Sequence, residues 1–275
     1  MRPDKILMCP PDYFTVEYEG NMFMDLKNPP DIRKAKEQWN NLKLIYTKLG
    51  FEVILIPPAK GFPDMVFTAN QSFPFVNENG KLQVILSKMK NSQRKDEVKY
   101  FKDFYEQRGY EILNLPEEIE FFESMGDAIM DYKRNIIFGG YGQRSQREAY
   151  RIIENYTGLE VVTLELINPY LYHLDTCFSI LDNNNVVIDE TAFSSDDLKK
   201  IQSYFKNVIV IDRKENMNSF ACNCHCPDGK NVIVQSGADN FTHKLQTEGF
   251  NIIETDTSEF IKSGGSVFCM KMMLW

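Results

Sequence analysis

The chain of 275 residues has a net charge of −8, with 43% hydrophobic and 25% charged residues, which is an ordinary globular composition. The acidic balance argues against a nucleic-acid partner, which requires a basic face, and gives no reason to expect binding to an anionic membrane. No apolar stretch approaches the ~20 residues of a membrane span, and Pro10 and Pro11 interrupt the N-terminal run that a secretory signal would need. We therefore expect a cytoplasmic protein whose six cysteines are reduced thiols.

One pattern recurs five times: an amphipathic helix, then a glycine or asparagine, then a short apolar strand. The predicted helices span about residues 31–49, 93–108, 145–156, 195–205 and 239–248. The strands that follow them span residues 51–57, 110–116, 159–165, 208–212 and 250–256. A repeat of about fifty residues is typical of stacked or ring-like copies of one supersecondary unit. Because no linker-like segment interrupts the repeat, we expect residues 1–275 to form a single domain.

Each strand continues into a stretch with hairpin signals, at residues 78–80, 182–185 and 227–229 in three of the copies. Helices outside and strands inside would bury both the apolar stripe of each helix and the apolar strands. The predicted fold is α/β, a closed five-bladed propeller-like ring with the strands around a central site. We expect residues 5–8 to add a strand that completes the last blade, and Ser145 with Glu148 to form a capping box on the third helix.

Polar residues suited to chemistry fall in the hairpin stretches, which a ring would bring together on its axis. Cys269 follows Gly264 and Gly265, which allow close approach to a ligand, so this cysteine is a candidate nucleophile. A lone cysteine in an apolar run is also typical of a core position, and the residue pattern leaves both interpretations open. His173 and Asp175 are predicted on one side of a strand as an acid/base pair.

Four segments resemble, in order, the signatures of the pentein guanidino-modifying enzymes. They are residues 63–70 (PDMVFTAN), 123–127 (ESMGD) and 173–175 (HLD), and the paired glycines ahead of Cys269. That family includes arginine deiminases, dimethylarginine dimethylaminohydrolases, amidinotransferases and arginine dihydrolases. The resemblance implies five ββαβ-type units, a small guanidino substrate, no cofactor or metal, and possible homo-oligomers. Ser124 stands where the family commonly has glycine, which changes the backbone freedom beside Glu123.

The resemblance also implies the catalytic roles. Cys269 would attack the guanidinium carbon as a thiolate and form a covalent S-amidino intermediate. His173 would protonate the departing amine and then deprotonate the incoming water, while Glu123 would hold and polarise His173.

Further residues are implied to bind the substrate. Arg144 matches an arginine that clamps the substrate carboxylate, because a planar fork suits a carboxylate. Lys88 stands where relatives often have arginine, which would make one clamp a point charge. Asp175 would pair with the guanidinium nitrogens. The polar shell around the substrate would be completed by Asp64 and Asp127, with Asn21 from the N-terminal loop as a further candidate.

Asn70 bears on the reaction, because related deiminases, dimethylarginine hydrolases and amidinotransferases carry aspartate there and dihydrolases resemble this chain in having asparagine. An amide can donate to a neutral ureido group as well as accept from it, which an ionised carboxylate cannot do. We therefore expect conversion of L-arginine to ornithine, carbon dioxide and two ammonia. The open alternatives are a dimethylarginine dimethylaminohydrolase, an arginine deiminase giving citrulline, and a non-catalytic interaction module like the ribosome anti-association factor.

Two other segments are given structural interpretations. In residues 222–226 (CNCHC), a strand would place three cysteines on one face, spaced too widely for all to reach a single zinc ion, which favours packing over a metal site. The charged run at residues 93–99 is interpreted as a solvated helix face.

Overall fold

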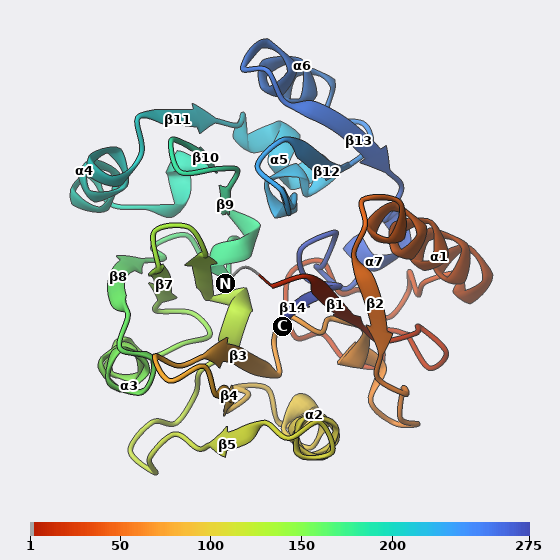
Figure 1. Cartoon of the computed structure of the whole chain (residues 1–275). Coiled ribbons are helices and arrows are strands. Elements are labelled where there is room, and N and C mark those ends of the chain that lie inside the picture. Colours follow the sequence, from red (N-terminus) through yellow and green to blue (C-terminus); the bar gives the residue numbers. More distant parts are fainter. Residues whose placement is uncertain (1–2) are drawn as a thin grey trace.

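The computed structural model describes residues 3–275, so the first two residues of the predicted 1–275 domain lie outside the description. Five small sheets surround a common centre and the longer helices lie outside them (Figure 1). The strands are β1 (Lys5–Met8), β2 (Glu52–Leu55), β3 (Ser72–Val76), β4 (Leu82–Leu86), β5 (Glu111–Leu113), β6 (Ala128–Asp131), β7 (Ile136–Tyr141), β8 (Glu160–Glu165), β9 (Phe178–Ile180), β10 (Asn185–Ile188), β11 (Asn207–Val210), β12 (Asn231–Gln235), β13 (Asn251–Thr255) and β14 (Met272–Leu274). The helices are α1 (Ile32–Lys48), α2 (Glu97–Glu106), α3 (Arg147–Thr157), α4 (Ser195–Tyr204), α5 (Arg213–Ser219), α6 (Asp239–Thr247) and α7 (Ser258–Ile261).

Three of the sheets repeat one pattern, an antiparallel hairpin followed by a helix and a parallel strand. In the first, β3 pairs antiparallel with β4, and β5 returns through α2 to pair parallel with β4. The same arrangement holds for β6–β7–β8 and for β9–β10–β11. Each strand after a helix therefore joins the hairpin that precedes the helix, because a parallel partner requires a crossover connection. The predicted blade, which grouped that strand with the following hairpin, is corrected in this respect.

The two ends of the chain close the ring. β1 pairs antiparallel with β14, Lys5 opposite Leu274, and parallel with β2, Lys5 opposite Glu52. The N-terminal strand thus joins the last strand of the chain, whereas β13 pairs with β12 in a separate sheet. This closure places the segment before β14 at the centre of the molecule (Figure 1).

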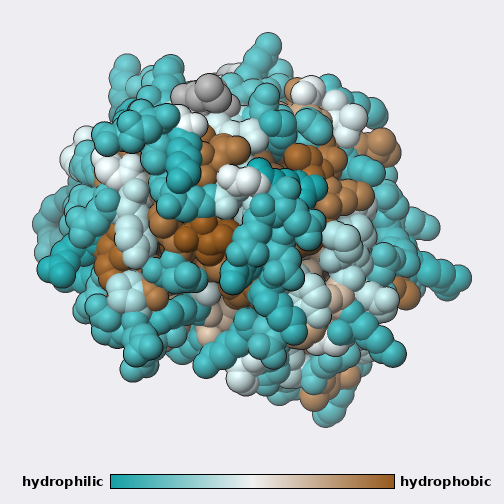
Figure 2. All heavy atoms as spheres, turned by 60° about the horizontal axis from the view of Figure 1, so that its bottom comes forward, coloured by the Kyte–Doolittle hydropathy of each residue, from teal (hydrophilic) through white to brown (hydrophobic). Residues whose placement is uncertain are grey.

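The outer helices face the sheets with their apolar stripes. On α1 the buried side chains include Trp39, Leu42 and Tyr46, which share a cluster with Ile6 and Met8 of β1. The face in Figure 2 is mainly hydrophilic, and its hydrophobic side chains gather in a few areas near the middle. None of the helices within residues 3–275 combines the length and the apolar character that crossing a membrane requires.

Two local predictions around the helix starts are wrong. Helix α3 begins at Arg147 with Gln146 as an N-cap whose side chain makes no capping bond. Ser145 instead donates its hydroxyl to Asp127 Oδ2 at 2.6 Å and accepts the Glu123 amide at 3.0 Å. A buried carboxylate and a buried peptide N–H require partners, whereas the exposed start of a helix can use water.

The charged run at residues 93–99 is not a solvated helix face. A short 3₁₀ turn spans Ser92–Arg94, and α2 starts only at Glu97. Arg94 is 5% exposed and Glu97 is 1% exposed, and their side chains form an ion pair with Nη2 and Oε2 3.1 Å apart. Buried charges occur where a partner is within reach, and here the turn directs both side chains inward.

Candidate active site

Short 3₁₀ turns carry the predicted site residues to the centre of the ring. They are Pro63–Val66, Ser124–Gly126 and Leu174–Thr176, and all of their residues are buried. Ser124 has a φ of 45°, in the left-handed region where relatives use glycine. Gly126 must lack a side chain, because a Cβ there would lie 2.5 Å from Asn70 Nδ2.

His173 and Asp175 do not share one face of a strand as predicted. They flank the start of the 3₁₀ turn Leu174–Thr176, so their side chains take different partners. His173 Nε2 lies 2.8 Å from Glu123 Oε2, whereas Asp175 Oδ2 accepts from the thiol of Cys269 at 3.1 Å. The turn thus distributes the histidine and the aspartate between two separate pairs.

In the first pair, formed by His173 and Glu123, the carboxylate charge has cationic partners. Glu123 is fully buried and also faces Arg144, whose Nη1 lies 3.2 Å from Oε2. Burial raises the pKa of Glu123, but the His173 hydrogen bond and the Arg144 charge outweigh it and lower the pKa to about 2. Glu123 is therefore ionised at neutral pH and fixes the orientation of the His173 ring.

The second pair centres on Cys269, which is 2% exposed. Its Sγ donates to Asp175 and accepts from Asn223 Nδ2 at 3.2 Å. Burial, and then the negative charge of Asp175, raise the pKa of the Cys269 thiol well above its ordinary value. Burial also raises the pKa of Asp175 to about 7. Burial and Asp175 therefore keep this cysteine a thiol at neutral pH when no cationic ligand lies in front of it.

Asn223 was missed by the sequence reasoning. Its Oδ1 accepts the backbone amides of Phe268 at 3.1 Å and Cys269 at 3.3 Å, so it fixes the turn that carries the thiol. It lies inside the CNCHC segment, where the cysteines drew attention instead. That segment is not one strand, since Ala221–Asn223 is a 3₁₀ turn and His225 forms an isolated bridge with Ile233. Within residues 3–275, no group of three or more His, Cys, Asp or Glu side chains could hold a metal ion.

A cavity of about 20 Å³ opens in front of Cys269. The polar side chains that line it are Tyr18, Asn21, Asp64, Asn70, Asn91, Arg94, Arg144, Tyr172 and Ser263. Around this centre, buried polar atoms without a hydrogen-bond partner remain on four side chains: Asp64 Oδ1, Asn70 Nδ2, Asp175 Oδ1 and Ser263 Oγ. Unpaired buried polar atoms are costly, so such a group is typical of a place where a polar ligand binds.

Arg94 is the second missed residue, and it controls the orientation of Asn70. Its Nη1 donates to Asn70 Oδ1 at 3.0 Å, and its Nη2 donates to the carbonyl oxygen of Asp64 at 3.2 Å. A guanidinium cannot accept a hydrogen bond, so the oxygen of the amide must face Arg94 and the NH₂ group is directed away from it. The only hint in the sequence is the Arg–Glu spacing of three residues, Arg94 with Glu97, inside the charged run.

The remaining predicted residues lie at different distances from the cavity. Asn21 lines it and donates to the carbonyl of Ser263 at 3.0 Å. Asp127 lies behind it, where it accepts from Ser145 and from the Leu174 amide, and burial raises its pKa to about 7. Lys88 is not brought to the cavity, because its Nζ donates to the Pro116 carbonyl at 2.7 Å. Arg94 lies in the cavity wall, whereas Lys88 does not.

Comparison with known proteins identifies the family. The chain matches the family model of eukaryotic N,N-dimethylarginine dimethylhydrolases over residues 10–275. The bifunctional arginine dihydrolase/ornithine cyclodeaminase AgrE of Nostoc sp. is 34% identical over 98% of this chain, which spans 37% of that relative. The N(G),N(G)-dimethylarginine dimethylaminohydrolase of Mycobacterium tuberculosis is 33% identical, over 98% of this chain and 85% of the relative. The chain thus spans just over a third of the cyanobacterial protein and most of the mycobacterial one.

Solved structures share the fold. The substrate-bound N-terminal domain of ArgZ, an arginine dihydrolase from cyanobacteria, superposes with a TM-score of 0.89 at 34% identity, covering 98% of this chain and 97% of that domain. Dimethylarginine dimethylaminohydrolase from Pseudomonas aeruginosa, complexed with citrulline, has a TM-score of 0.80 at 22% identity over the whole of both chains. These matches confirm the pentein fold expected from the repeat and the four signatures. The chain belongs to the dimethylarginine dimethylaminohydrolase family of pentein guanidino hydrolases, enzymes that break C–N bonds of amidines.

Proposed function

We propose that the chain hydrolyses free L-arginine to ornithine, carbon dioxide and two ammonia, with Cys269 as the nucleophile. The two pairs around the cavity support this reaction, because they supply a thiol for attack and an oriented imidazole for proton transfer. A cationic guanidinium in front of Cys269 and Asp175 would lower the pKa of both groups. Substrate binding itself would then generate the thiolate.

The chemistry proceeds by two similar steps. The Cys269 thiolate adds to the guanidinium carbon, and His173 transfers a proton to the departing nitrogen, which leaves as ammonia. A water molecule that loses its proton to His173 attacks the S-amidino carbon, and the thiolate leaves, which gives citrulline. In a second round Cys269 adds to the ureido carbon of citrulline, the second ammonia leaves, and water releases the N-carboxylate of ornithine, which loses carbon dioxide to give ornithine. Glu123, ionised and bonded to His173 Nε2, stabilises the imidazolium in both steps and leaves Nδ1 for proton transfer. A covalent reaction intermediate is bound in one variant of the ArgZ domain, which supports this route.

The observation that carries the dihydrolase assignment is the orientation of Asn70. Its Oδ1 is held by Arg94, and its Nδ2 has no hydrogen-bond acceptor in the described part of the chain. A guanidinium offers only donors to this NH₂ group, whereas the ureido oxygen of citrulline is an acceptor. Asn70 therefore favours retention of a neutral ureido group for a second hydrolysis. An aspartate would present two acceptors and lose this interaction.

A dimethylarginine dimethylaminohydrolase is the second candidate, and the family model together with the mycobacterial relative favours it. It would use the same cysteine, histidine and glutamate and release dimethylamine and citrulline. The two candidates differ in the substrate consumed and in the fate of citrulline. Product analysis with arginine, citrulline and dimethylarginine offered separately distinguishes them.

We expect the native protein to release two ammonia per arginine with little accumulated citrulline. Asn70→Asp should shift the products toward citrulline by roughly ten- to a hundred-fold, the equivalent of ~1–3 kcal/mol for an unpaired buried polar group. Asn91→Asp is the matched control, because Asn91 lines the same cavity and bonds Arg94 through its backbone carbonyl, which the substitution keeps. Citrulline as the sole product of the native protein would refute the dihydrolase assignment, and faster turnover of dimethylarginine would favour the second candidate.

A further inference from the structure

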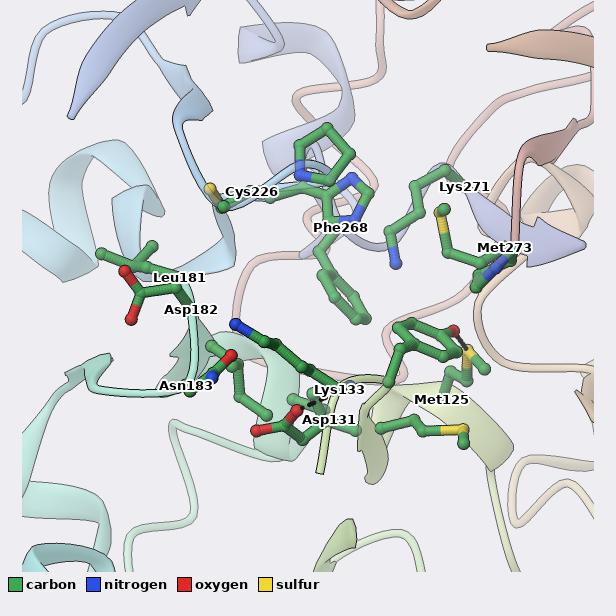
Figure 3. A pocket seen from close by; sticks show the side chains of 18 residues that line it. Met125, Asp131, Lys133, Leu181, Asp182, Asn183, Cys226, Phe268, Lys271 and Met273 are labelled. Atoms are coloured by element: carbon green, nitrogen blue, oxygen red, sulfur yellow. Dashed lines mark hydrogen bonds between the residues drawn. The ribbon is translucent and has the colours of Figure 1, made fainter. Parts of the chain in front are cut away.

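A second cavity, of about 80 Å³, lies behind the catalytic cysteine (Figure 3). Cys269 lines the front cavity, while Phe268 and Lys271 line the rear one, so the segment Phe268–Lys271 is the wall between them. The rear cavity is bordered by the hairpin turns after β6 and β9, at Asp131–Lys133 and Leu181–Asn183, and by Met273 of β14. Arg144 lines the front cavity but not this one.

Lys271 is the unusual residue of this cavity. It is 1% exposed, and its side-chain amine forms no hydrogen bond or ion pair with any residue from 3 to 275, although Nζ lies 3.1 Å from the centroid of the Phe268 ring. Figure 3 shows the amine pointing into the cavity, between Phe268 and Met273. A buried ammonium without an acceptor is costly, and an aromatic face replaces only part of its hydration. The cavity therefore holds an unmatched positive group.

None of the other charged side chains that line the cavity forms an ion pair with the Lys271 amine, so an anion can take that place. Lys133 contributes a second amine, which Figure 3 shows directed toward Asn183. The two carboxylates nearby are already used by their own turns. Asp131 accepts the amides of Lys133 and Arg134 and the Arg134 side chain, and Asp182 accepts from Asn184 and Asn185.

Apolar side chains form much of the remaining wall, namely Met125, Ile129, Leu181, Phe268 and Met273, beside the polar side chains of Tyr132, Asn183 and His225. A multiply charged anion such as phosphate would lose much hydration here without gaining enough donors. A carboxylate with a short aliphatic chain matches both the amine and the apolar wall, and its size suits a cavity of this volume. We propose that the rear cavity is a binding site for a small aliphatic carboxylate, held by Lys271.

Binding at this site would be pH-dependent. Burial lowers the pKa of Lys271 to about 7, against the opposing charges of Asp175 and Cys269 on the front side. His225, which also lines the cavity, stays neutral because burial lowers its pKa well below the ordinary value. The other charged side chains that line the cavity are those of Lys133, Asp131 and Asp182. Only the protonated form of Lys271 attracts a carboxylate, so affinity should fall about tenfold from pH 6 to pH 8.

Occupancy would also affect the front cavity, a consequence that rests on the proposed function. The Lys271 charge lowers the pKa of Asp175 against the effect of burial. A carboxylate on Lys271 would cancel part of that influence and return a proton to Asp175. The rear site would then weaken arginine binding without competing for the same space. Direct measurement of carboxylate binding tests the site independently of this consequence.

The experiment is calorimetric titration with propionate at constant ionic strength. Cys269→Ser saturated with L-arginine is used, so that Arg144 cannot bind the propionate and no turnover occurs. Adding Lys271→Met should weaken propionate binding at least tenfold, whereas Lys199→Met, which removes one exposed lysine charge, should not change it. Should Lys271→Met fail to fold, the tenfold weakening from pH 6 to pH 8 with Lys271 present tests the same assignment.

Absence of propionate binding, equal binding after Lys271→Met, or tighter binding of phosphate or chloride than of propionate would overturn the proposal. Arginine binding is measured first in the same samples. If arginine fails to bind, the proposed function fails, and the front cavity is then closed to carboxylates by Arg144→Met before propionate is titrated. The two failures are thereby distinguishable.

Discussion

Each of the two sides of the active site buries a carboxyl group, but the pKa of the two groups is shifted in opposite directions. On the histidine side, formed by Glu123, His173 and Arg144, the pKa of the carboxyl is lowered to about 2. On the cysteine side, formed by Asp175, Asn223 and Cys269, the pKa of the carboxyl is raised to about 7. Both carboxylates have at most 1% of their surface exposed, so burial alone does not decide the outcome. Their partners do, because Glu123 faces a histidine and an arginine whereas Asp175 faces a thiol.

The two sides also differ in whether the hydrogen bonds of their carboxylate are complete. Both oxygens of Glu123 are hydrogen-bonded, whereas Asp175 keeps one oxygen without a partner. A bound cation would complete the cysteine side and leave the histidine side unchanged. Under the proposed function, the thiolate would therefore form when a guanidinium binds in front of Cys269 and Asp175.

The largest expected effect is on the histidine side. His173→Gln should lower kcat by about 10²–10⁴-fold at every pH from 6 to 9, because proton transfer to the leaving nitrogen is lost. The measurement is ammonia release from arginine. His243→Gln is the matched control, since His243 lies exposed on α6 and should leave the rate unchanged. An unchanged rate in His173→Gln would remove the histidine side from the mechanism.

On the cysteine side, Asp175→Asn should make Cys269 more reactive while abolishing hydrolysis. After burial, Asp175 is the main group that raises the pKa of the thiol, through its charge and its hydrogen bond. Removing the charge lowers that pKa, and each unit increases the thiolate fraction about tenfold at pH 7.5. Iodoacetamide alkylation followed by mass spectrometry measures the effect, with Cys269→Ser to identify the reacting thiol. Slower alkylation in Asp175→Asn would contradict the electrostatic account.

The pH dependence of arginine binding gives a smaller effect. The carboxyl of Asp175, with a pKa raised to about 7, is mainly protonated at pH 6 and mainly ionised at pH 8. Arginine should therefore bind about tenfold more weakly at pH 6 than at pH 8. Calorimetry on Cys269→Ser avoids turnover and keeps a hydroxyl that can donate to Asp175. The added change Asp175→Asn should flatten this profile, and a profile that stays steep would assign the titration to another group.

The sequence predicted what depends on local pattern. The apolar stripe at residues 31–49 gave α1 (Ile32–Lys48) within one residue at each end, and turn signals located the β3–β4 and β9–β10 hairpins but not the β6–β7 hairpin. The resemblance to the pentein family predicted that Cys269, His173 and Glu123 lie in one catalytic site. Neither local pattern nor resemblance identified Arg94 and Asn223. A buried polar residue is identified as functional by the side chain it contacts, and the sequence does not show contacts between distant residues. Those partners, Asn70 and Cys269, lie 24 and 46 residues away along the chain.

Lys88 is the residue on which sequence reasoning and structure differ most, and it gives the smallest expected effect on activity. The position suggested a substrate clamp, yet its amine donates to the Pro116 carbonyl, and the cavity wall contains Arg94 instead. Lys88→Met should leave the KM for arginine near the native value and lower stability by about 1 kcal/mol, the usual net contribution of one hydrogen bond. Lys90→Met removes a comparable bond to the Gln143 carbonyl from a more exposed lysine and should cost less stability. Steady-state kinetics measures the KM of both variants, and thermal unfolding measures their stability. A tenfold higher KM in Lys88→Met with unchanged stability would mean that this amine reaches the substrate and that Lys88 acts as the predicted clamp.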